Sequence, residues 1–77
     1  MHEHGLMKAI VEQALRVAEG PVTLVTIRVG ELSGSSPGHL TDHFRIATRG
    51  TPLENVALRI LPCEGSGVRL ESIEVDT

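Results

Sequence analysis

The core of this chain has to be built almost entirely from aliphatic side chains. Its 77 residues include one Phe and neither Trp nor Tyr, and a chain of this length buries only about 60% of the surface of its unfolded form. Because each side chain offers little bulk, the apolar residues must lie on one face of every helix and strand. We expect one domain that spans residues 1–77, with a single core.

The spacing of apolar residues predicts five elements. A period of about 3.6 residues indicates a helix and strict alternation indicates a strand, which gives helix, strand, helix, strand and strand over residues 6–19, 22–31, 37–48, 56–61 and 68–75. Gly20-Pro21 ends the first helix, and Ser36-Pro37 supplies the N-cap and first-turn proline of the second. The predicted fold class is α+β, with two helices packed on a small three-stranded mixed sheet in the order α-β-α-β-β.

The last predicted strand contains an irregularity. Val68 and Leu70 stand at even positions, whereas Ile73 and Val75 stand at odd ones. A regular strand would place these two pairs on opposite faces of the sheet, because a shift of one residue reverses the face. A β-bulge near residues 71–72 would return all four side chains to the same face.

Charge and composition exclude several classes of function. The formal net charge is −3, no basic cluster is present and one aromatic side chain cannot form a stacking platform, so we expect no nucleic-acid partner. No apolar run reaches the length of about 20 residues that a membrane span needs, and no signal peptide is visible. Cys63 is alone, which fits a reducing cytoplasm. Neither Cys63 nor Ser33 has an activating base at a recognisable spacing, so no enzyme active site is predicted.

The first four residues, Met1-His2-Glu3-His4, gather potential metal ligands. A terminal amine is partly deprotonated at neutral pH, and an imidazole is mostly neutral. An ion that displaces the proton of the His2 amide would be held by the Met1 amine, that amide and the His2 imidazole, a planar nitrogen set that suits Ni(II) or Cu(II). Glu3 and His4 are the nearest candidates for further contacts. The alternative is an ordinary polar terminus that frays.

Four segments in this order resemble one known family. They are the Met1–Glu3 opening with an amphipathic helix behind it, the strand and turn Val25–Ser33, the run Arg49–Glu54 and the last strand Leu70–Val75. Together they resemble the hydrogenase and urease nickel-incorporation family, HypA. The resemblance implies a nickel-binding metallochaperone domain, not an enzyme. Such a domain passes Ni(II), with a GTPase accessory protein, to the large subunit of a nickel–iron hydrogenase or to urease.

The chain departs from that family at two places. The family carries a zinc-binding lobe with two Cys-x-x-Cys pairs between its last two strands, whereas residues 62–67 of this chain form a short turn that holds only Cys63. One thiol cannot make a four-coordinate zinc site, so we expect no zinc. A connection this short also favours an antiparallel hairpin between the last two strands. Ser36 stands where the family often has an acidic residue, and His4 could replace that ligand.

Two further hypotheses stay open. His39 and His43 are spaced i and i+4 on the second predicted helix, so their rings could chelate a second metal ion. The alternative is a partly exposed pair at the edge of the helix. A chain without the zinc lobe could also be a degenerate HypA-like module that only contacts proteins and does not deliver metal. Such a module could form homodimers through an uncovered sheet edge.

Overall fold

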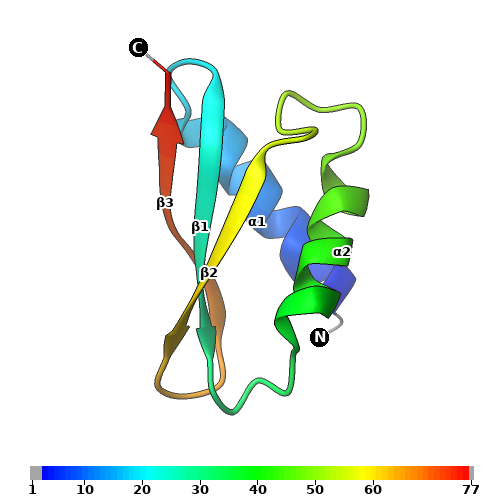
Figure 1. Cartoon of the computed structure of the whole chain (residues 1–77), viewed down its shortest axis with the longest axis vertical. Helices are drawn as coiled ribbons and strands as arrows, with labels where there is room; N and C mark the ends of the chain where they lie inside the picture. Colours follow the sequence, from blue (N-terminus) through cyan, green and yellow to red (C-terminus); the bar gives the residue numbers. More distant parts are fainter. Residues whose placement is uncertain (1–2, 77) are drawn as a thin grey trace.

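A computed structural model describes residues 3–76, with side chains described from Gly5 onward. It contains five elements in the predicted order (Figure 1): α1 Glu3–Val17, β1 Val22–Gly30, α2 Pro37–Thr48, β2 Ala57–Cys63 and β3 Val68–Val75. The predicted α+β fold class, with two helices and three strands, is confirmed. The first helix begins at Glu3 rather than at residue 6, and the second strand continues to Cys63.

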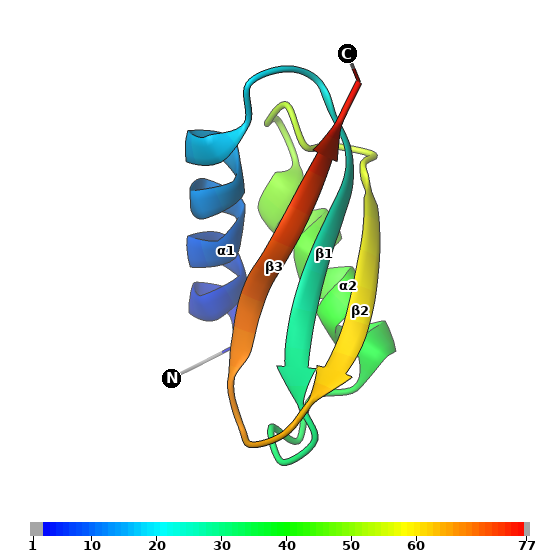
Figure 2. The ribbon, with the colours of Figure 1, turned by 90° about the vertical axis from the view of Figure 1, so that its left-hand side faces the viewer.

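The two helices cover one face of the sheet and leave the other face open (Figure 2). The strand order is β2-β1-β3, so β1 is central. β2 pairs with β1 in parallel and β3 pairs with it antiparallel, which makes the sheet mixed, as predicted. α2 joins β1 to β2, because parallel neighbours need a crossover rather than a tight turn. Within the described residues, no helix is long and apolar enough to cross a membrane.

The predicted hairpin between β2 and β3 is wrong. These strands lie on opposite sides of β1, and residues 64–67, which join them, pass across its end. The short connection does make the two strands run antiparallel, but it does not make them neighbours. β1 takes the central place because Val25, Thr26 and Ile27 are buried in succession. A strand at the edge of the sheet could not bury such a run.

Gly30 allows the connection to pass this close to β1. The amide of Gly30 donates to the carbonyl of Gly67 over 2.7 Å, and the amide of Leu32 donates to the carbonyl of Gly65 over 2.8 Å. A Cβ atom at Gly30 would overlap the carbonyl group of Gly65. Gly65 has a φ of +89°, a conformation that side chains disfavour. The turn therefore lies in direct contact with the end of the central strand.

Pro62 belongs to β2 and not to the turn, which corrects the predicted boundary of the connection. It stands opposite Val29 of β1 in the parallel register. A proline lacks the N–H of a regular ladder, so it is tolerated in a strand at the edge of a sheet. The turn itself is confined to residues 64–67.

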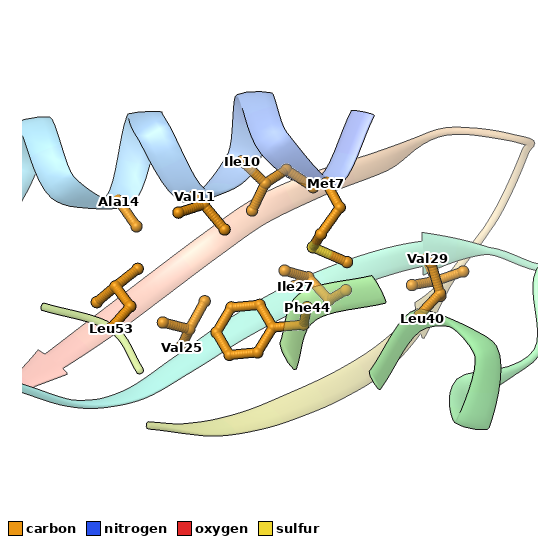
Figure 3. Packing of buried hydrophobic residues seen from close by; sticks show 10 residues of the cluster. All are labelled: Met7, Ile10, Val11, Ala14, Val25, Ile27, Val29, Leu40, Phe44 and Leu53. Carbon is orange, nitrogen blue, oxygen red and sulfur yellow. The ribbon is translucent and has the colours of Figure 1, made fainter. Parts of the chain in front are cut away.

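The core lies between the helices and the sheet (Figure 3). Every element but the two edge strands supplies fully buried apolar side chains, and a loop supplies one more: Met7, Ile10, Val11, Ala14, Val25, Ile27, Val29, Leu40, Phe44 and Leu53. The edge strands contribute side chains that are partly buried against this cluster, including Leu58, Ile60 and Leu70. The predicted aliphatic core is therefore present, with Phe44 as its one aromatic member.

The irregularity in β3 is the predicted bulge. The register against β1 shifts between Leu70 and Ser72, which leaves Glu71 without a partner on the central strand. The carboxylate of Glu71 lies 3.3 Å from Nε of Arg28. The bulge thus keeps Leu70 and Ile73 against the core while it places an acidic side chain beside a basic one on β1.

Candidate metal centre

All four predicted N-terminal ligands lie at or before the first turn of α1. Met1 and His2 fall outside the described residues. Glu3 and His4 open the helix, and their side chains are not among those described. The structure therefore gives the beginning of the helix that follows Met1 and His2, and the ligand set is still a prediction.

The beginning of α1 is anchored to the core a short distance behind that point. Met7 is 1% exposed, and its side chain reaches from α1 toward Ile27 and Phe44 (Figure 3). Ile10 continues the buried face one turn further along the helix. A helix fixed this close to its first residue gives the preceding ligands a defined attachment to the body of the protein.

The start of a helix also offers backbone amides that have no other partner. The first four N–H groups of an α-helix find no carbonyl within the helix. Because α1 begins at Glu3, an ion that displaces an amide proton at or next to this residue breaks no helical hydrogen bond. The partial positive charge at this end of the helix stabilises a deprotonated amide nitrogen and weakens the hold on a cation.

His39 and His43 form a pair on one flank of α2. Their ring centroids are 4.7 Å apart, and the ring planes are tilted by 42°. His39 is exposed and His43 is half-buried, which agrees with the predicted position at the edge of the helix. The amide of His39 donates to Oγ of Ser36 over 3.2 Å, so the predicted N-cap is confirmed. Ser36 therefore ends the loop as a helix cap.

Cys63 is a free, half-buried thiol at the end of β2, beside the turn that crosses β1. Between Gly5 and Asp76 no three His, Cys, Asp or Glu side chains come together in a group that could hold a metal ion. Among the described residues, His39 and His43 are two potential ligands of the predicted kind that lie close together.

A groove that the sequence did not indicate lies between α2 and β2, with a volume of about 550 Å³. Phe44 and Leu58 supply apolar walls, and the exposed Arg45 and Arg49 stand one turn apart along one side. The i, i+4 spacing of these two arginines was a visible signal, but spacing alone does not show that a loop and a strand edge complete a hollow beside them.

The sequence of this chain is similar to those of a known family of proteins. A profile that describes metallochaperones for nickel incorporation into hydrogenase and urease matches residues 1–75. The chain is 41% identical over 64 residues to a hydrogenase maturation factor HypA of Archaeoglobus fulgidus, a match that covers 78% of this chain and 58% of that protein. It is 35% identical over 68 residues to the factor of the same name from Rippkaea orientalis, with coverage of 87% and 60%.

The chain belongs to the HypA family of nickel-incorporation metallochaperones. A third relative, a hydrogenase maturation factor HypA of Desulfosudis oleivorans, is 42% identical over 65 residues and is covered over 56% of its length. The chain thus spans a little over half the length of these curated relatives. The resemblance found in the sequence is confirmed over nearly all of its residues.

Proposed function

We propose that this chain is a nickel-binding domain that carries Ni(II) and releases it for the maturation of a nickel–iron hydrogenase or a urease. The observation that supports this most directly is the family match, which begins at residue 1 and runs to residue 75. It therefore includes the Met1-His2-Glu3 opening together with the helix that presents it. The protein would act as a carrier and not as an enzyme.

The ion would be held by nitrogen atoms of the chain start. The Met1 amine, the His2 amide and the His2 imidazole supply three donors of a planar site, and Glu3 offers an amide or a carboxylate for the fourth. His4 is the nearest further ligand. No helical hydrogen bond opposes the loss of the amide proton at the start of α1. A site with an open coordination position lets a ligand of the receiving protein bind the ion before the ligands of the donor dissociate.

The expected partners follow from the family. We infer that a GTPase accessory protein works with this domain and that the large subunit of a hydrogenase receives the ion, in the cytoplasm. The names of the relatives, hydrogenase maturation factors, support the hydrogenase route. Since the chain spans only a little over half of those relatives, these partners are inferred for the nickel-binding part.

We further infer that the turn at residues 64–67 stands in the place of a zinc lobe. The resemblance places that lobe between the last two strands, and here Gly65 and neighbouring residues close this gap directly against Gly30. Cys63 is the chain's one cysteine, so we expect nickel and no bound zinc. Metal analysis of protein purified without chelators would test this: zinc at one equivalent would contradict it.

A titration of untagged protein with Ni(II) tests the proposal. We expect one equivalent to produce the yellow, diamagnetic absorption of a planar, amide-ligated ion. His2→Ala and acetylation of the amine should each abolish this absorption. Lys8→Ala, an exposed change on the same helix, should leave it unchanged. Uptake that survives both capping and His2→Ala, or transfer of nickel at equal rates from His2→Ala, would refute the proposed site.

A further inference from the structure

The four histidines of this chain fall into two pairs, and one pair is not used by the proposed chain-start site. His39 and His43 stand on α2, on the flank opposite to Thr41 and Arg45, which face the groove beside β2. His39 is exposed and His43 is half-buried, with its Nδ1 atom out of contact with solvent. The half-buried ring is held more firmly than a free surface ring, which prepares the pair for a ligand.

The separation of the two rings is that of a chelate. An imidazole–metal bond of about 2.1 Å puts the ion roughly 3.2 Å from the ring centroid. Two such rings would have centroids roughly 4.5 Å apart at a right angle between the bonds and roughly 5.2 Å apart at the tetrahedral angle. The observed separation is 4.7 Å. The separation of the ring centroids therefore permits chelation once a nitrogen atom of each ring is turned toward the ion.

The position of the pair in the fold relates it to the proposed site at the chain start. α1 and α2 pack against each other, and both helices begin in the same half of the molecule along its longest axis (Figures 1 and 2). The buried side chains of Met7 and Leu40 join these two helix beginnings in the core. An ion on the pair would thus be held on a helix that packs against the helix behind the chain start.

We propose that His39 and His43 form a second, labile Ni(II) site. Imidazole is a good ligand for Ni(II), and no third His, Cys, Asp or Glu joins the pair among residues 5–76. Within that range the pair supplies two of the six positions of an octahedral ion, and water can occupy the others. Such a site binds weakly and exchanges quickly. Its use as an entry point that feeds the chain start rests on the proposed function; the binding itself does not.

The binding is tested in protein whose chain start cannot compete. In acetylated His2→Ala protein, substoichiometric Ni(II) should broaden the NMR signals of the His39 and His43 ring protons first, because a six-coordinate Ni(II) ion is paramagnetic. His39→Gln, a change at an exposed residue, should remove the broadening at His43. Arg45→Gln, on the other flank of the same helix, should leave it. Unbroadened rings, or broadening that persists in His39→Gln, would overturn the proposal.

A separate measurement tests whether the pair acts as an entry point that passes Ni(II) to the chain start. In protein with a free amine, stopped-flow absorption follows the growth of the planar, yellow species after mixing with Ni(II). We expect His39→Gln to slow this growth several-fold and to leave its final amplitude unchanged. Equal rates in His39→Gln and Arg45→Gln would overturn the entry role. Absence of the yellow species in every variant would instead refute the proposed chain-start site, while the NMR experiment would still report on the pair.

Discussion

Substitution of Gly30 by Ala should destabilise this domain more than any other exchange of glycine for alanine that the structure describes. A Cβ atom at this position would lie 2.6 Å from the carbonyl carbon of Gly65 and 2.8 Å from the amide nitrogen of Ser66. Both are backbone atoms, so no flexible side chain can move aside. The turn would have to shift away from the end of β1.

The size of the effect follows from what holds the turn in place. Two backbone hydrogen bonds of 2.7 and 2.8 Å tie it to Gly30 and Leu32, and a third of 2.9 Å joins Glu31 to Cys63 at the end of β2. Overpacking costs about 1–3 kcal/mol, and each hydrogen bond that is lost removes about 0.5–1.5 kcal/mol. We expect the free energy of unfolding to fall by about 2–4 kcal/mol. At about 4–8 °C per kcal/mol for a domain of this size, Tm should fall by about 8–32 °C.

Urea unfolding followed by circular dichroism measures this change. The matched control is Gly67→Ala in the same turn, where an added Cβ meets no atom within 4 Å. That variant should stay within about 0.5 kcal/mol of the original protein. If Gly30→Ala and Gly67→Ala unfold at the same urea concentration, the turn does not press on β1 as described, and the reasoning fails.

Three further changes test other parts of the fold by the same unfolding assay. Met7→Ala should lower the free energy of unfolding by about 2–5 kcal/mol, because the side chain is fully buried between α1 and the core; a loss below about 1 kcal/mol would contradict that packing. Ser36→Ala removes the N-cap of α2 and should cost about 0.5–2 kcal/mol, whereas Ser36→Gly should cost only a few tenths. Gly5→Ala should stabilise α1 by about 0.5–1 kcal/mol, since open space surrounds the new methyl group; destabilisation would show that the first turn is not helical.

Local signals in the sequence predicted the elements well. Ser36-Pro37 fixed the start of α2, because a cap and a first-turn proline act within a few residues of each other. The change of parity between Leu70 and Ile73 predicted the bulge, because alternation leaves no other way to keep both side chains on the core face. These features depend on neighbours in the chain, which a sequence displays directly.

The pairing of the strands could not be read in the same way. A short connection between β2 and β3 suggested a hairpin, but the choice of partner depends on which strand gains most from lying between two others. β1 does so through Val25, Thr26 and Ile27. Gly30 was a visible sign that backbone would pass close by, yet a glycine after a strand also fits an ordinary loop. Only the folded structure distinguishes a close approach of the backbone from an ordinary loop.

For the candidate site, too, the local features could be predicted from the sequence and the packing could not. The motif at Met1-His2-Glu3 follows from the types of its donors and from the family, and the structure adds the anchored start of α1 behind it. The spacing of His39 and His43 predicted neighbouring rings. The position of α2 against α1 depends on how the two helices pack and could not be obtained from spacing.

The strand β3 ends at one end of the longest dimension, which is 35 Å, and α1 begins in the other half of the molecule (Figure 1). A protein immobilised just after β3 would therefore hold the beginning of α1 away from the point of attachment. Biotin or an affinity handle placed there leaves the amine of Met1 unmodified. Sensor-chip measurements with a soluble recipient protein could then be made on the same sample that takes up the ion.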